Sequence, residues 1–303
     1  MAVLVSAGIT IVSWASAFAG ISAGLRAYSP AHLALVRYAV ASVTLALYAV
    51  ATRMPLPRAR DIPGFALTGI VGITFYNVAL GYGQTAVPAA TASLLIASAP
   101  AWLALVASVF LGERLRPRGW AGIALSLAGV AVISAGKGLG LQIEPQALIV
   151  LSAAVASSLY SLGQKAFLSR YSALQCATYA IWSGTVFLLP FAPGLLDSLK
   201  AASPAHTAAV VYLGIVPGAL GYVAWSNVLS RLPAATAGSF LHLVPPVAML
   251  IAWIWLGEVP SIVSVAGGAL VLAGVVMVNM RGRALSAENG VERVDDGHTP
   301  VDQ

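Results

Sequence analysis

The sequence predicts an all-α integral membrane protein in which ten transmembrane helices form two inverted five-helix repeats. Three observations support this fold class. Hydrophobic residues make up 59% of the 303 residues and charged residues only 9%, whereas soluble domains carry about 25% charged residues. The apolar runs are about 20 residues long, enough for a helix to cross a hydrocarbon core of roughly 30 Å. Finally, one stretch of the chain occurs twice.

The repeated stretch covers Pro88–Glu113 and Pro233–Glu258, which lie 145 residues apart and align without a gap. Both copies open with Pro-Ala-Ala-Thr-Ala and close with Leu-Gly-Glu. The same register pairs glycines further along the chain, Gly122 with Gly267 and Gly129 with Gly274. A fixed internal period identifies one half of the chain as a diverged copy of the other.

Turn residues, above all proline, divide the chain into ten apolar spans. Proline suits the first turn of a helix, where its missing N–H would be unpaired anyway. We expect an N-terminal repeat over 1–140, an inverted C-terminal repeat over 141–282 and, because residues 283–303 are polar, a disordered cytoplasmic tail. The predicted spans are 3–23, 31–52, 63–85, 89–111, 118–136, 146–168, 173–196, 205–230, 234–256 and 261–280.

Lysine and arginine are distributed unevenly between the two sides of the predicted spans. With the N-terminus inside, twelve fall on inner segments, and three, Arg26, Lys137 and Lys200, fall on outer segments. The positive-inside rule therefore places both termini in the cytoplasm. This distribution accounts for the net charge of +6 without a nucleic-acid partner, so the expected partner of the surface is the lipid bilayer.

Five spans per half is an odd number, so the second copy must enter the membrane upside down. Inverted repeats are characteristic of secondary transporters, whose sites lie near the midplane between the repeats. Each half can then adopt the conformation of the other, which exchanges an outward-open shape for an inward-open one. The repeat therefore predicts alternating access. It also predicts that Glu113 faces the cytoplasm and that Glu258 faces outside.

No acidic residue lies in the middle of a predicted span. Those before the tail all fall at span ends or in loops: Asp61, Glu113, Glu144, Asp197 and Glu258. We therefore expect facilitative transport, or at most coupling through a histidine, rather than a proton relay through buried carboxylates. The single Cys176 excludes an intrachain disulfide and a cysteine metal cluster. Catalytic motifs are also missing, so we expect no enzyme activity, cofactor or metal.

The ten spans, with Pro-Ala-Ala-Thr-Ala opening the fourth and ninth and Leu-Gly-Glu closing them, resemble the EamA-type permeases of the drug/metabolite transporter superfamily. The resemblance covers nearly all of residues 3–280. Within that superfamily the chain is similar to the YddG-type amino-acid exporters of bacterial inner membranes. The resemblance implies export of small metabolites, amino acids foremost, through the inner membrane.

Aromatic and polar side chains at mid-depth mark the predicted substrate site. Tryptophan and tyrosine normally lie at the lipid interfaces, so rings deep within a span either pack helices together or line a cavity. An aromatic wall attracts an ammonium group by roughly 0.5–2 kcal/mol and also accepts apolar side chains. We expect an amphipathic, zwitterion-binding cavity formed by Trp14, Asn77, Tyr82, Ser98, Trp102, Tyr160, Tyr222, Trp225 and His242.

Arg37 and four prolines complete the predicted site. Arg37 lies about seven residues from the outer end of the second span, where it either snorkels to the surface or attracts a substrate carboxylate at the cavity mouth. His242 is the mid-span group that titrates near neutral pH, which suits structure, substrate or proton roles. Mid-span prolines bend their helices, either for packing or as hinges, and here they are Pro100, Pro217, Pro245 and Pro246.

The sequence favours a secondary transporter of small amphipathic metabolites in the bacterial inner membrane. A drug or nucleotide-sugar permease of the same superfamily is the alternative, although phosphorylated substrates favour a basic pair and only Arg37 lies mid-span. A membrane enzyme or an assembly subunit is a further alternative, disfavoured by the missing motifs and by the inverted repeat. The fifth and tenth spans carry few polar groups, so we expect them at the periphery, where they offer a homodimer contact.

Overall fold

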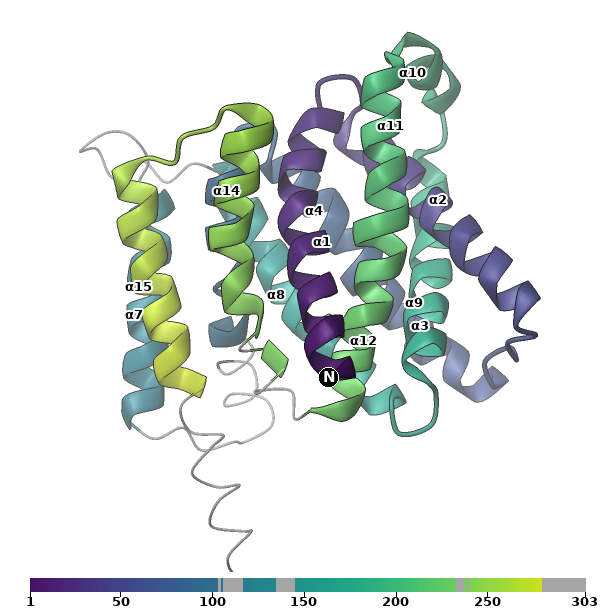
Figure 1. Ribbon diagram of the computed structural model, residues 1–303, viewed down its shortest axis with the longest axis horizontal. Helices are drawn as coiled ribbons and strands as arrows, with labels where there is room; N and C mark the ends of the chain where they lie inside the picture. Colours follow the sequence, from purple (N-terminus) through teal and green to yellow (C-terminus); the bar gives the residue numbers. More distant parts are fainter. Residues whose placement is uncertain (103–104, 106–116, 135–144, 233–236, 239, 280–303) are drawn as a thin grey trace, which may run out of the picture.

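The chain folds into a bundle of helices that run roughly along one direction (Figure 1). This computed structural model describes residues 1–102, 105, 117–134, 145–232, 237–238 and 240–279. The first half contains α1 (Ala2–Gly24), α2 (Pro30–Ala51), η1 (Ala59–Asp61), α3 (Ile62–Gly69), η2 (Ile70–Phe75), α4 (Tyr76–Gly83), α5 (Ala89–Ile96) and α7 (Pro117–Ser134). The second half contains α8 (Pro145–Phe167), α9 (Ala173–Leu188), η3 (Leu189–Phe191), α10 (Leu195–Ala201), α11 (Pro204–Leu213), η4 (Gly214–Leu220), α12 (Gly221–Arg231), η5 (Leu241–Leu243), α14 (Val244–Leu256) and α15 (Ile262–Asn279).

Apolar helices of the described residues match all ten predicted spans. Six are long and apolar enough to cross a membrane by length and composition: Ala2–Gly24, Pro30–Ala51, Ala59–Gly83, Pro145–Phe167, Ala173–Phe191 and Pro204–Arg231. Four shorter apolar helices match the other spans: Ala89–Trp102, Pro117–Ile133, Leu241–Leu256 and Ile262–Val278. The all-helical membrane fold is thereby confirmed. Glu113, the expected repeat boundary at 140/141 and the expected tail lie outside the described residues.

The seventh span is shorter than its predicted range of 173–196. The membrane-length helix ends at Phe191, and the separate helix α10 follows. Gly194 stands directly before α10 with a φ of 78°, a left-handed conformation that glycine adopts without steric cost. This turn redirects the chain at a position where an apolar run alone suggests a continuous helix.

Proline and serine set the start of several helices. α2 begins at Pro30, and the Oγ of the preceding Ser29 accepts a hydrogen bond of 3.2 Å from the backbone N–H of His32. A proline at this position sacrifices no helical hydrogen bond, and the serine satisfies one free N–H group. α9 starts with a capping box, in which Ser172 and Gln175 bind each other's backbone N–H.

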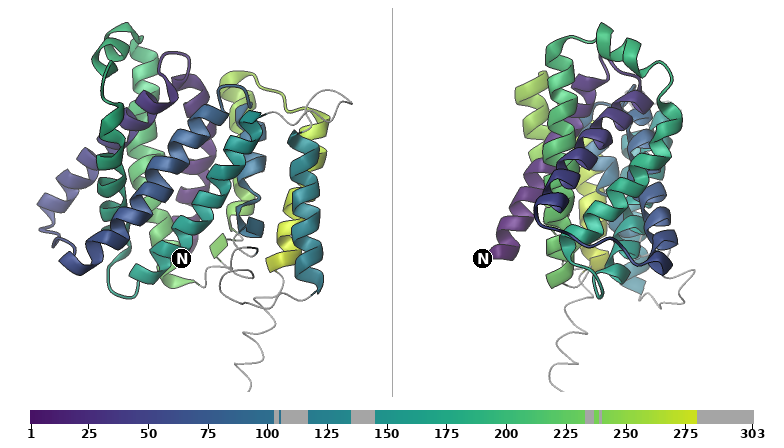
Figure 2. Two further views of the ribbon diagram at one scale, coloured as in Figure 1. Left: turned by 180° about the vertical axis from the view of Figure 1, so that it is seen from behind. Right: turned by 90° about the vertical axis from the view of Figure 1, so that its right-hand side faces the viewer.

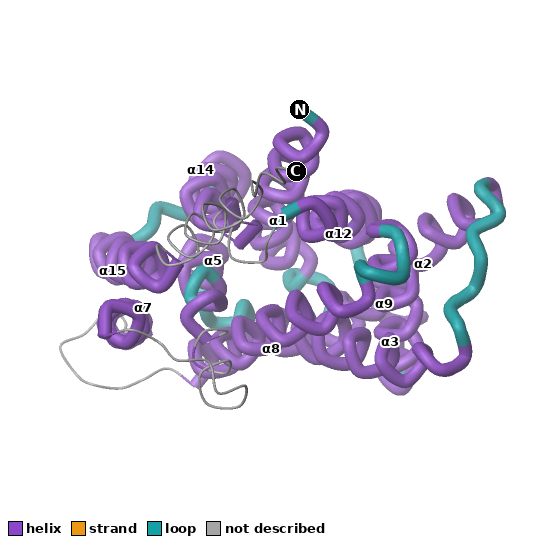
Figure 3. The backbone as a smooth tube through the Cα atoms, turned by 90° about the horizontal axis from the view of Figure 1, so that it is seen from below, coloured by secondary structure: helices purple, strands orange, loops and turns teal. Residues whose placement is uncertain are grey.

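α7 and α15 pack against each other along one side of the bundle (Figures 1 and 3). A Cβ atom at Gly122 would lie 2.7 Å from the carbonyl oxygen of Gly274, and one at Gly267 would lie 2.8 Å from that of Gly129. These four residues form what we call the glycine crossing. From one contact to the next, the residue number rises from 122 to 129 along α7 and falls from 274 to 267 along α15. The two helices are therefore antiparallel. In the repeat Gly122 corresponds to Gly267 and Gly129 to Gly274, so a two-fold axis that exchanges the two halves turns one contact into the other. This symmetry supports the inversion of the second repeat.

The two halves interlock. α4 of the first half packs against α8 of the second, and α12 of the second half packs against α1 of the first. These two contacts are equivalent under the repeat, because α4 and α12 end the third and eighth spans while α1 and α8 open the two halves. α5 and α14 also contact each other. The middle of the bundle is therefore lined by both repeats.

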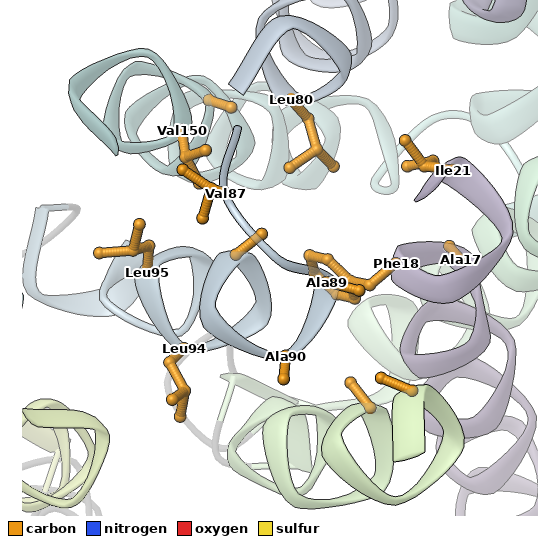
Figure 4. Packing of buried hydrophobic residues seen from close by; sticks show 14 of the residues in the cluster. Ala17, Phe18, Ile21, Leu80, Val87, Ala89, Ala90, Leu94, Leu95 and Val150 are labelled. Carbon is orange, nitrogen blue, oxygen red and sulfur yellow. The ribbon is translucent and has the colours of Figure 1, made fainter. Parts of the chain in front are cut away.

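Small and branched residues fill the contact among α1, α5, α8 and α14. Figure 4 shows Phe18 of α1 next to Ala89 of α5, with Leu95 and Val150 further along the same cluster. Ala89, Leu95 and Val150 are all 0% exposed. The alanines of Pro-Ala-Ala-Thr-Ala thus allow a close helix approach, as small residues commonly do between membrane helices.

The two ends of the bundle carry different connections. The N-terminus lies at one end and α10 at the other (Figures 1 and 2). Near the N-terminal end, Arg170 forms an ion pair of 2.7 Å with Asp61, and the hydroxyl of Tyr171 donates a hydrogen bond of 2.6 Å to the same carboxylate. These contacts join the start of α3 in the first half to the turn between α8 and α9 in the second.

Candidate substrate site

The third and eighth spans become π-helical at equivalent positions of the repeat. η2 covers Ile70–Phe75 and η4 covers Gly214–Leu220, and a shift of 145 residues brings the first segment onto the second. π-helical turns are rare and occur frequently at functional sites. Pro217, one of the predicted hinges, lies inside η4, whereas η2 contains no proline. The sequence therefore indicates an irregular turn in η4, through Pro217, but gives no such signal for η2.

The fourth span is interrupted near its predicted hinge. α5 ends at Ile96, and Pro100 stands in the next helical turn. Proline cannot donate the backbone hydrogen bond that would continue the helix. At the interruption, the hydroxyl of Ser158 on α8 donates a hydrogen bond of 2.6 Å to the carbonyl oxygen of Ala99. The other half of the protein thus satisfies a backbone group beside the break.

The ninth span changes direction at the equivalent position. The short helix η5 precedes α14, whose first turn contains Pro245 and Pro246. The two prolines therefore stand at the start of a helix and not in the middle of a continuous one. His242 lies within η5, partly buried, and its Nε2 has no hydrogen-bond partner among the described residues. Discontinuous membrane helices commonly form transporter binding sites.

Five aromatic rings meet where α1, α2, α8 and α12 come together. The Trp14 ring lies 5.4 Å from Tyr222 and 5.5 Å from Trp225, measured between ring centroids. Tyr160 lies 5.6 Å from Tyr222, and Tyr38 lies 6.3 Å from it and donates a hydrogen bond of 3.2 Å to its hydroxyl. These separations are typical of interacting aromatic pairs. We call this set the aromatic cluster; both repeats contribute to it.

Gln164 and Ser226 border the aromatic cluster with polar groups. Gln164 is 2% exposed, and its Nε2 donates hydrogen bonds of 2.8 Å to the Tyr160 hydroxyl and 2.7 Å to Ser226 Oγ. The Tyr222 hydroxyl donates a long hydrogen bond of 3.5 Å to the carbonyl oxygen of Gly72, within η2. These bonds connect the π-helical turn of the first repeat to the second repeat.

Three buried polar atoms of this region find no hydrogen-bond partner within the described part of the chain. They are Trp14 Nε1, Trp225 Nε1 and Gln164 Oε1. Leaving such a group unpaired in a packed interior costs about 1–3 kcal/mol. Two N–H donors and one amide oxygen around the aromatic cluster therefore retain unused hydrogen-bonding capacity.

Arg37 and Asn77 form a buried pair between α2 and α4. Each is 3% exposed, and Arg37 Nη1 donates a hydrogen bond of 2.9 Å to Asn77 Oδ1. Asn77 Nδ2 in turn donates 2.8 Å to the carbonyl oxygen of Ile73 in η2. The guanidinium lies 5.2 Å from the centroid of the Tyr38 ring. The structure therefore places Arg37 inside the bundle, next to the aromatic cluster, and not at the surface.

Comparison with known proteins decides the class of this fold. The model of the EamA-like transporter family matches residues 2–135 and matches a second time over residues 145–280. The chain belongs to the EamA-like transporter family. The resemblance inferred from the repeated motif is confirmed, as is the expectation of an integral membrane transporter that is not an enzyme. The two matches correspond to the two halves of the internal repeat.

Several relatives of this EamA-like transporter are named as exporters. A "Probable terminal-alkyne amino-acid exporter" of Streptantibioticus cattleyicolor is 46% identical over 90% of this chain and 92% of its own. A "Probable amino-acid metabolite efflux pump" of Salmonella typhimurium is 28% identical over 88% and 91%. The "Uncharacterized transporter YdfC" of Bacillus subtilis is 37% identical over 92% and 91%. A solved crystal structure, 22% identical, shares the fold with a TM-score of 0.64 over 93% and 97%.

Three other predicted site residues of this EamA-like transporter, Ser98, Trp102 and Tyr82, form no ring pair or side-chain hydrogen bond with the aromatic cluster among the described residues. Ser98 is 0% exposed and accepts a hydrogen bond of 3.0 Å from Trp102 Nε1 at the interruption of the fourth span. Tyr82 on α4 is 47% exposed and does not join the cluster. Within the described ranges, no three His, Cys, Asp or Glu side chains lie close enough together to hold a metal ion.

Two members of the site were not indicated by the sequence, Tyr38 and Ser226. Each directly follows a candidate, Arg37 and Trp225 respectively, in the middle of a span. A hydroxyl beside a mid-span charged or aromatic residue was the available signal. It is weak, because serine in a membrane helix commonly bonds to its own backbone, and Ser226 also donates 2.9 Å to the Tyr222 carbonyl oxygen.

Proposed function

We propose that this EamA-like transporter moves amino acids and similar small zwitterions out of the bacterial cytoplasm by alternating access, with the aromatic cluster as its substrate site. The observation that carries the proposal is the group of unpaired atoms, Trp14 Nε1, Trp225 Nε1 and Gln164 Oε1, among the described residues. Two indole N–H groups suit a carboxylate, which only accepts hydrogen bonds. The amide oxygen and the aromatic faces suit an ammonium group.

The charges of the spans argue against a cationic substrate. The acidic residues before the tail lie at span ends or in loops, so a cationic drug would find no mid-span carboxylate. Arg37, beside the cluster, adds attraction for the carboxylate end of a zwitterion. The names of two relatives, an amino-acid exporter and an amino-acid metabolite efflux pump, point to the same substrate class.

The direct test is counterflow into liposomes that contain the full-length protein. Vesicles are loaded with unlabelled L-leucine, L-methionine, L-phenylalanine or L-threonine, and uptake of the labelled amino acid is measured without a proton gradient. We expect counterflow for at least one of the four, because facilitative exchange needs no gradient. Absence of counterflow for all four, with or without a pH gradient, would rule out the proposed function. Uptake only of a nucleotide sugar would favour the other permease class.

Replacing Trp225 by Phe tests the proposed site; the variant keeps an aromatic ring but, because Trp225 is buried, the smaller ring also leaves a cavity. The ring remains, but the indole N–H is lost, and a hydrogen bond to a charged group contributes about 1.5–3 kcal/mol. We therefore expect the half-saturation concentration for the amino acid to rise by roughly 10- to 100-fold. Trp253→Phe is the matched control, because Trp253 is 58% exposed on α14 and should leave transport unchanged. Equal kinetics in both variants would remove Trp225 from the site.

A further inference from the structure

A polar pocket opens at the end of the bundle opposite the N-terminus. Its volume is about 410 Å³, within the range of roughly 300–1,000 Å³ found for small-molecule sites. Three parts of the chain line it: the end of α1 with the residues that follow it, the segment between α4 and α5, and the segment after α14. Its charged and amide side chains are Arg26, Gln84 and Glu258. We call it the outer pocket.

The outer pocket holds opposite charges that do not neutralise each other. Glu258 Oε2 accepts a hydrogen bond of 3.0 Å from the backbone N–H of Ala89 at the start of α5. Arg26 is exposed, and the described side chains contain no ion pair between Arg26 and Glu258. Two unlike charges that line one pocket without pairing with each other are available to the two charged ends of a zwitterion.

Gln84 supplies an independent sign of a ligand. It is 6% exposed, and its Nε2 donates hydrogen bonds of 3.0 Å to the Phe18 carbonyl oxygen and 3.2 Å to Ser22 Oγ. Its Oε1 is buried and unpaired as far as the described residues show. Gln84 and Glu258 line the same pocket, and an amide oxygen and a carboxylate are both acceptors that an ammonium group can bind.

We propose that the outer pocket is a second binding site for the amino acid, with the carboxylate at Arg26 and the ammonium at Glu258 and Gln84 Oε1. The proposal rests on the proposed function, since it assumes the same zwitterionic substrate. Ser22, which lines the pocket, follows Trp14 by eight residues on α1, about 12 Å at 1.5 Å per residue. The outer pocket therefore lies between the aromatic cluster and the water at that end of the bundle.

The test measures how many amino-acid molecules bind to the purified full-length protein. Equilibrium dialysis uses whichever of labelled L-leucine, L-methionine, L-phenylalanine or L-threonine shows the strongest binding to the wild type. The variants are Arg26→Gln and Glu258→Gln, whose glutamine can still accept the Ala89 N–H bond and so preserves the start of α5. Lys200→Gln is the matched control, because it removes an exposed positive charge at the same end of the bundle without lining the pocket.

We expect two equivalents bound to the wild type and to Lys200→Gln, and one equivalent bound to each pocket variant. In Trp225→Phe the outer pocket should still bind one equivalent, while binding at the central site should weaken by roughly 10- to 100-fold. A single equivalent in the wild type that is lost in Trp225→Phe and unchanged in the pocket variants would overturn the outer pocket and leave the proposed function intact. Binding that depends on Arg26 and Glu258 but not on Trp225 would overturn the central site instead. No binding to the wild type would overturn both.

Discussion

The Arg37 guanidinium is buried in the bundle. Among the described residues it contacts one amide oxygen, that of Asn77, and the face of the Tyr38 ring. Its Nε has no partner among the described residues. A buried charge with so few partners does not stabilise a fold, because desolvation costs several kcal/mol. The arrangement is consistent with a residue that is held ready for a substrate carboxylate.

The double variant Arg37→Met/Asn77→Leu separates stability from transport. It removes the buried charge together with its partner, and the Ile73 carbonyl oxygen that loses the Asn77 bond still accepts one from the Tyr76 backbone N–H. We therefore expect the melting temperature to equal or exceed that of the wild type. Counterflow should fall at least tenfold. Thermal melts followed by size-exclusion chromatography, together with the liposome assay, give the two readouts. Unchanged counterflow in a folded double variant would show that Arg37 serves structure alone.

Single residues of the site differ in how far the sequence predicts them. Trp14, Tyr160, Tyr222 and Trp225 are predictable, because rings at mid-depth in a membrane span call for a partner other than lipid. Tyr82 satisfies the same criterion, yet it follows Asn77 by five residues, which turns it about 140° around the helix from the buried side at 100° per residue. Which face of α4 is buried depends on the packing of α2 and α8, which the sequence of α4 alone does not contain.

At the scale of helices, the irregular turns of the site divide into two kinds. The interruptions at Pro100 and Pro245 and the π-helix around Pro217 are predictable, because proline removes a backbone hydrogen bond. The equivalent π-helix Ile70–Phe75 contains no proline to indicate an irregular turn. The change from α-helical to π-helical hydrogen bonding in η2 occurs where this segment packs against α8 and α9 of the second repeat. Local sequence therefore predicts breaks but not shifts imposed by packing.

The glycine crossing gives a prediction for the pair α7 and α15. In Gly129→Ala the new methyl group would lie 2.5 Å from the Gly267 carbonyl oxygen, and crowding of this kind costs about 1–3 kcal/mol. We expect a melting temperature roughly 2–6 °C below that of Gly8→Ala, a variant that gains the same helix propensity without the crowding.

Gly8→Ala is the matched control for the crossing. It brings the same gain in helix propensity, about 1 kcal/mol, but its Cβ would meet nothing within 4 Å. Gly8→Ala should therefore melt at or above the wild-type temperature. A Gly129→Ala variant that melts together with Gly8→Ala would mean that α7 and α15 are not in close contact.

At the scale of the whole molecule, the two ends of the bundle differ in their links between the repeats. At the N-terminal end, Asp61 joins Arg170 and Tyr171 across the two halves. At the opposite end, Glu258 of the second repeat binds the start of α5 in the first. If the basic residues set the orientation as the positive-inside rule requires, the first link faces the cytoplasm and the second faces outside.

Cysteine labelling in intact cells tests this orientation. The background is Cys176→Ala, since Cys176 is the single cysteine of the chain and is 0% exposed. Single cysteines then replace two exposed residues, Ser169 between α8 and α9 and Lys200 on α10. A membrane-impermeant thiol reagent should label position 200 and not position 169, and lysis should expose both. Labelling of 169 alone would reverse the assigned orientation, and labelling of both in intact cells would contradict the transmembrane arrangement.

The glycine crossing has a consequence for the order in which the gene encodes the two halves. Gly122 meets Gly274, and Gly267 meets Gly129, so each contact becomes the other when the two halves change places. The glycine crossing is therefore the same whichever half is translated first. A circularly permuted chain that began with the second half and ended with the first would present the same four glycines to one another, and the crossing would form in the same way.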